Sequence, residues 1–78
     1  MDLGRGVFMK YTINVVWDGE AGVWCASCND IPLALESSSF DNLIQRVKIV
    51  AHEILDLNGE LTNDTHLCFQ TNHWEQIA

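Results

Sequence analysis

The feature that most constrains the fold is one amphipathic segment in the middle of the chain, from Ser37 to Gly59. Its apolar residues recur at intervals of three and four, which places them on one face of an α-helix. Ser38 or Ser39 supplies a capping oxygen for the first turn, and Asn58-Gly59 offers the left-handed backbone that closes a helix. The apolar stripe comprises Phe40, Leu43, Ile44, Val47, Ala51, Ile54 and Leu57. The pattern predicts one long helix whose apolar face packs on a sheet.

Segments with period-two alternation lie on both sides of this helix and predict four strands. They cover residues 10–17, 23–29, 33–36 and 65–71. Residues 18–22 contain an aspartate and two glycines, which is typical of a hairpin loop, and Pro32 interrupts the alternation. A right-handed crossover through the helix can place the last strand beside the first and parallel to it. The predicted class is α+β, in the order β-β-β-α-β, with one helix on one face of a small mixed sheet.

The length of the chain, 78 residues, fits one domain with a single core. We expect residues 1–8 to form a loose N-terminal extension and residues 9–78 to form the domain. No segment approaches 18 consecutive apolar residues, so the sequence predicts neither a membrane span nor an export signal. Three cysteines are an odd number, which favours a reducing cytoplasm over a disulfide scaffold.

The charge is strongly acidic, because eleven Asp and Glu residues stand against four Lys and Arg residues, for a formal net charge of −7. Phosphate contacts depend on Lys and Arg, so the composition argues against direct binding to nucleic acid. An acidic surface fits a basic protein partner, whose approach its field would steer. The alternative is that the charge only keeps a small protein soluble.

Side chains with possible chemical roles do not form a recognisable catalytic or metal-binding pattern. Cys25 and Cys28 are three residues apart on a predicted strand, so their sulfurs should point to opposite faces of the sheet. His66 and Cys68 share a face, with His73 nearby, which is a weak metal-binding signal beside the more common solvent-facing role. The first strand has no acid in its interior, unlike a nuclease that holds two metal ions. We therefore expect no enzyme activity, no cofactor and no metal.

The segment Trp24-Cys-Ala-Ser-Cys-Asn-Asp-Ile-Pro32, followed by a serine-capped helix, resembles the HicB-like antitoxin superfamily. Its members have a strand that ends in Asp-Leu/Ile-Pro before a helix. A small uncharacterised branch without a C-terminal DNA-binding domain also has a WD-E-AGVW hairpin and a helix ending in LNG, as at residues 17–24 and 57–59 here. The likeness covers about residues 9–60, and Leu33 stands where glycine is usual. The resemblance implies a partial ribonuclease H-like fold.

The resemblance also implies an antitoxin-like protein that binds and masks a small basic RNA-cleaving toxin of the HicA type. Asp18, Glu20 and Asp30 are the expected partner contacts, because they place acids on loops around the sheet. The alternative is a stand-alone module that self-associates through its sheet edges or its uncovered face. Short edges, an uncovered face and a small core predict a homodimer or higher homo-oligomer.

Overall fold

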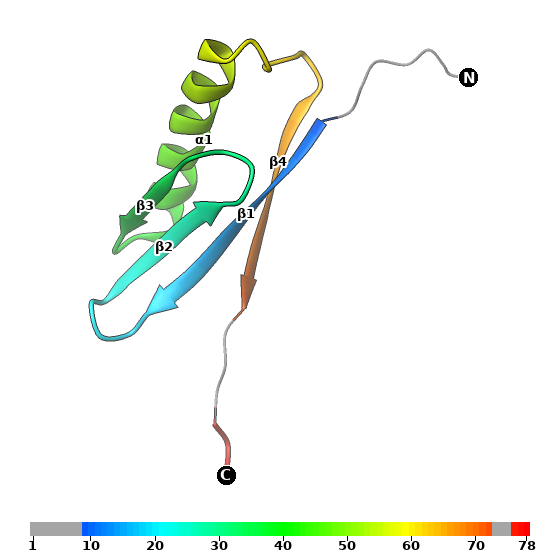
Figure 1. Cartoon of the computed structure of the whole chain (residues 1–78). Helices are drawn as coiled ribbons and strands as arrows, with labels where there is room; N and C mark the ends of the chain where they lie inside the picture. The colour runs from blue at the N-terminus through cyan, green and yellow to red at the C-terminus, as the bar shows by residue number, and fades with distance from the viewer. Residues whose placement is uncertain (1–8, 73–75) are drawn as a thin grey trace.

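The computed structural model describes residues 9–72 and 76–78, and it shows one helix packed on one face of a four-stranded sheet (Figure 1). The elements in chain order are β1 (Met9–Asp18), β2 (Val23–Cys28), β3 (Ala34–Ser37), α1 (Phe40–Leu57) and β4 (Thr65–Asn72). The strands lie side by side in the order β3-β2-β1-β4. The predicted α+β class and the order β-β-β-α-β are confirmed. The predicted extension, residues 1–8, and His73 lie outside the described residues.

The central strand β1 pairs antiparallel with β2 and parallel with β4, as the crossover argument predicts. Asp18 lies opposite Val23 at one end of the β1–β2 hairpin. The carboxylate Oδ1 of Asp18 accepts hydrogen bonds from the backbone N–H groups of Glu20 and Ala21, at 3.1 and 3.2 Å. The N–H of Gly22 donates to the Asp18 carbonyl oxygen over 2.8 Å, and Gly22 has a φ of +69°, which favours glycine. The loop is therefore closed by Asp18, the last residue of β1.

The core lies between α1 and the sheet and is entirely apolar among the described residues. Alternation along β1 buries every second side chain, and steps of four along α1 bury a matching row. The ten buried residues are Tyr11, Ile13, Val15, Ala26, Ile31, Leu33, Leu43, Val47, Ala51 and Leu55. The α1 helix is not long and apolar enough to cross a membrane.

The helix begins and ends inside its predicted range. The hydroxyl oxygen of Ser39 accepts a hydrogen bond from the N–H of Asn42 over 3.2 Å, which confirms Ser39 as the N-cap. The prediction that Leu57 belongs to the buried stripe is wrong, because its side chain is 85% exposed. Successive steps of four residues rotate the buried row around the helix, so the last buried position is Leu55. Two further residues turn Leu57 by about 200°, away from the sheet.

The third strand begins one residue later than the alternation predicts. The N–H of Leu33 donates to the carbonyl oxygen of Ile31 over 2.7 Å, so it is used in a tight turn around Pro32. The ladder therefore begins at Ala34, opposite Ser27. The turn still buries the side chains of Ile31 and Leu33 against the core.

Candidate partner-binding surfaces

A row of three aromatic side chains lies at the hairpin end of the sheet. The ring centroids of Trp17 and Trp24 are 5.1 Å apart, and those of Trp24 and Phe40 are also 5.1 Å apart, with the second pair edge-to-face. Trp17 lies opposite Trp24 on the paired strands, and Phe40 opens α1. Trp17 and Phe40 each remain 37% exposed, so the row presents apolar area to solvent. Aromatic pairs at this spacing are stabilising beyond their burial, which holds the row in place.

Two of the three acids predicted as partner contacts lie beside this row. Asp18 is the last residue of β1 and Glu20 lies on the hairpin loop, and both are exposed. Asp30 is exposed beyond the opposite end of β2, and the length of that strand puts it roughly 16 Å or more from the loop. The structure therefore brings Asp18 and Glu20 together but not Asp30. We call Trp17, Asp18, Glu20, Trp24 and Phe40 the acidic-aromatic end.

A second feature is a groove of about 320 Å³ between α1 and β4. The helix lies over β2 and β3, so the inner face of β4 is left partly uncovered (Figure 1). The floor of the groove is mostly apolar, and its lining includes Lys48 and His52 from the exposed side of α1. The apolar lining consists of Ala51, Leu55, Leu61, Leu67 and Phe69.

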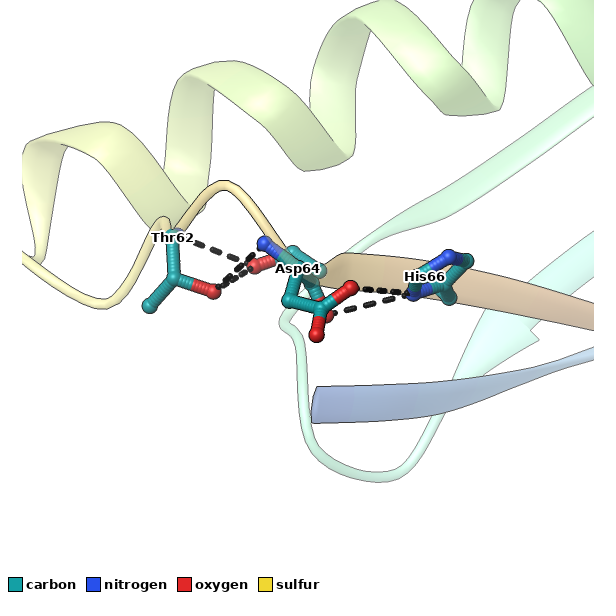
Figure 2. Close-up of polar contacts among 4 residues, drawn as sticks. Thr62, Asp64 and His66 are labelled. Atoms are coloured by element: carbon teal, nitrogen blue, oxygen red, sulfur yellow. Dashed lines mark hydrogen bonds and ion pairs between the residues drawn. The ribbon is translucent and has the colours of Figure 1, made fainter. Parts of the chain in front are cut away.

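The start of β4 is fixed by a short polar network (Figure 2). The N–H of Thr62 donates to the hydroxyl of Thr65 over 3.0 Å, and the N–H of Asp64 donates to the hydroxyl of Thr62 over 3.2 Å. The Asp64 carbonyl oxygen accepts from the N–H of Met9 at 3.1 Å, and His66 Nδ1 lies 3.2 Å from the same oxygen. These contacts set where β4 enters the sheet and therefore its register against β1.

The two edges of the sheet differ in their protection. β3 has four residues, and the carbonyl oxygen of Glu36 on its outer side accepts a hydrogen bond from Arg46 Nη1 over 2.8 Å. β4 has eight residues, with no proline, lysine, arginine or acid among them. Charges, prolines and shortness are the usual devices that keep sheet edges from pairing with other chains. β3 is short and carries the charge of Glu36, whereas β4 is long and has none of these devices.

Within the part of the chain that the structure describes, the cysteines and histidines do not form a cluster. Cys25 lies opposite Val16 and Cys28 lies opposite Ile13, so the two cysteines point to opposite faces of the sheet, as predicted. Cys68 is exposed on β4, next to His66. Among residues 9–72 and 76–78, no three His, Cys, Asp or Glu side chains are grouped so that they could hold a metal ion.

Comparison with known proteins places these surfaces in a family. Residues 10–77 match the model of a domain of unknown function, DUF1902. The chain belongs to the DUF1902 family. A crystal structure of a hypothetical protein from the extremely thermophilic bacterium Thermus thermophilus is similar, with a TM-score of 0.75 and 30% sequence identity. That likeness covers 87% of this chain and 99% of the other. No curated protein was found to match the chain.

The DUF1902 match extends from β1 to beyond β4, so both the acidic-aromatic end and the β4 edge lie within the family domain. The sequence indicates the acids but not the aromatic row, because Phe40 reaches Trp24 only when the helix packs on the sheet. A signal was available for the hairpin part of the row, since Trp17 and Trp24 flank a short loop. The uncharged composition of β4 was equally visible in the sequence.

Proposed function

We propose that this DUF1902 protein is a non-catalytic binding protein that captures a basic protein partner at its acidic-aromatic end. The observation that carries the proposal is the partly exposed row of Trp17, Trp24 and Phe40. The exposed acids Asp18 and Glu20 lie beside it. Tryptophan anchors dominate the binding energy of many interfaces, and aromatic faces also attract Lys and Arg side chains. The net charge of −7 would speed the approach of a basic protein.

The class of partner comes from the resemblance to HicB-like antitoxins, which implies a small basic RNA-cleaving toxin of the HicA type. Masking such a toxin needs only tight binding, so the antitoxin-like protein itself requires no catalytic group. As part of the same proposal, we infer that the fold is related to a partial ribonuclease H-like fold and that the protein acts in the cytoplasm. The alternative function is a stand-alone homo-oligomeric module, which the unprotected β4 edge favours.

The test is co-expression with the basic product of a neighbouring gene. Growth arrest by that product, relieved by this chain, is the expected result. A double variant, Asp18→Asn with Glu20→Gln, should lose the rescue, while Asp30→Asn at the far end of β2 should keep it. Asparagine at position 18 retains the side-chain oxygen that closes the loop, so the fold is preserved in this comparison.

Two results would overturn the proposal. The first is a neighbouring product that is harmless, or arrest that persists although both proteins are expressed in soluble form. The second is rescue that the double variant at the acidic-aromatic end retains in full. In a gel-shift assay we expect no retardation of RNA or DNA by the chain alone, because its described surface has few cations.

A further inference from the structure

The backbone of β4 points half of its hydrogen-bonding groups away from the sheet. Met9 lies opposite Thr65 and donates its N–H to the carbonyl oxygen of Asp64. In a parallel ladder this pattern turns the backbone groups of every second β4 residue toward β1. The backbone N–H and C=O groups of His66, Cys68 and Gln70 therefore point toward β1. The residues whose N–H and C=O groups face outward are Thr65, Leu67, Phe69 and Thr71.

These outward groups form an open template. The described part of the chain offers no hydrogen-bond partner to them, since β4 is the last strand of the sheet. The strand carries no Asp, Glu, Lys or Arg, so two molecules of charge −7 can meet here without placing like charges in contact. The side chains of Leu67 and Phe69, on the groove side, are only partly buried.

We propose that β4 is the contact surface for a second copy of this chain, which adds its own β4 in antiparallel orientation to form one continuous eight-stranded sheet. The inference does not depend on the proposed basic partner, whose site lies on another part of the molecule. Closed two-fold pairing of identical surfaces is the commonest form of self-association.

The alternation along β4 determines the register. Antiparallel partners must match outward residues with outward residues, so the strands can shift only in steps of two. One register pairs all four outward residues within β4: Thr65 with Thr71 of the second copy, and Leu67 with Phe69 of the second copy. By symmetry this gives about eight hydrogen bonds, similar to the roughly ten of a standard interface. It also matches polar with polar and apolar with apolar side chains, as favourable cross-strand pairs require.

The same register places Cys68 on the two-fold axis, opposite Cys68 of the second copy. This pair is of the non-hydrogen-bonded type, with Cα atoms about 4.5 Å apart, which lies within the range that a disulfide spans. Cys68 is the one exposed cysteine, whereas Cys25 and Cys28 are half-buried. A disulfide between the two Cys68 side chains would therefore reveal the contact without an introduced cysteine.

The first test uses a mild added oxidant, which takes two electrons from the two thiols as the disulfide forms. In the variant Cys25→Ser with Cys28→Ser, we expect a covalent dimer on a non-reducing gel. The added variant Cys68→Ser should abolish it. Equally slow cross-linking in native buffer and in denaturant would indicate random collision and overturn the proposal.

The second test removes one outward N–H group of β4 and leaves the hydrogen bonds between β4 and β1 in place. The N–H of Thr71 faces outward, so Thr71→Pro deletes no bond to β1, and proline is tolerated on such an edge. Thr71→Val is the matched control that keeps the N–H. Light scattering should give twice the 8.8 kDa mass of one chain for the wild type and for Thr71→Val. In Thr71→Pro the dissociation constant should rise at least roughly 30-fold, from two lost hydrogen bonds.

A wild type that is monomeric at micromolar concentration overturns the proposal. So does a dimer that survives Thr71→Pro unchanged, since the contact would then lie on the uncovered sheet face. If circular dichroism shows that Thr71→Pro does not fold, the Cys68 cross-linking test still decides the question, because its variant keeps Thr71. Loss of dimerisation with full binding of a basic partner would separate this proposal from the proposed function.

Discussion

Arg46 reaches from α1 to the outer edge of the sheet and donates a hydrogen bond from Nη1 to the backbone carbonyl oxygen of Glu36, over 2.8 Å. Glu36 faces Cys25 in the β2–β3 ladder, at a position where the carbonyl of β3 points away from β2. The guanidinium therefore joins the helix to the short edge strand and occupies an acceptor that another chain could use. The bond both anchors β3 and protects it.

Arg46→Ala should lower the free energy of unfolding by about 1 kcal/mol, because it removes one hydrogen bond at an exposed site. Arg46→Lys keeps the charge but not the planar donor group, so it should recover only part of the loss. Urea denaturation of the three proteins measures the difference. Equal stability of Arg46→Ala and the wild type would mean that the bond contributes nothing in solution.

Leu43 and Leu57 are the same residue type on one helix, at 0% and 85% exposure. Leu43→Ala should cost about 2–5 kcal/mol, because it removes apolar contacts and leaves a cavity. Leu57→Ala should change the free energy of unfolding by less than about 0.5 kcal/mol. Thermal or urea unfolding compares them directly, and similar losses in both would contradict the orientation of α1.

Ser39→Ala should destabilise the protein by about 1 kcal/mol, since the N–H of Asn42 loses its capping acceptor. Ser38 precedes the cap, is exposed and makes no capping bond in the structure, so Ser38→Ala is the matched control. Differential melting temperatures provide the measurement. A larger loss in the Ser38 variant would show that the helix begins one residue earlier.

Gly59 closes the helix with a φ of +70°, whereas an added Cβ at Gly19 meets only the ordinary contact of the Trp17 indole nitrogen at 3.6 Å. Gly59→Ala should therefore cost about 1 kcal/mol from backbone strain, and Gly19→Ala should be close to neutral. Unfolding midpoints in urea distinguish them. Tolerance of alanine at position 59 would contradict the left-handed conformation there.

The architecture could be predicted from the sequence because the spacing of apolar residues matches the period of each strand and of the helix. Alternation along β1 predicts the buried side chains of Tyr11, Ile13 and Val15. A right-handed crossover through the helix predicts that β4 pairs parallel with β1. Ser39 was one of two expected caps, and its hydroxyl oxygen is the one that accepts. The prediction for Leu57 is wrong because it follows steps of three residues from Ala51 through Ile54, whereas the buried row advances by four residues to Leu55.

The candidate surfaces were less predictable because they depend on tertiary contacts. Phe40 meets Trp24 only after α1 packs on the sheet, and Arg46 finds Glu36 across an element boundary. The loop positions of Asp18 and Asp30 predict one shared site, but the two residues lie at opposite ends of β2. The length of β2 alone sets this separation, so the predicted strand at residues 23–29 already implied it.

The parallel pairing of β1 with β4 also has a consequence for the order of folding. Met9 lies opposite Thr65, so the chain between them must be closed into a long loop before this ladder can form. The β1–β2 hairpin closes through a short loop, so it can form early, and β4 should dock last. A nascent chain would then hold β1 as a temporary edge until its own β4 arrives. While β4 has not yet docked, β4 of another molecule could pair with the open edge of β1. Rapid formation of α1 shortens this interval, because it brings β4 of the same chain toward β1, and it thereby limits strand exchange.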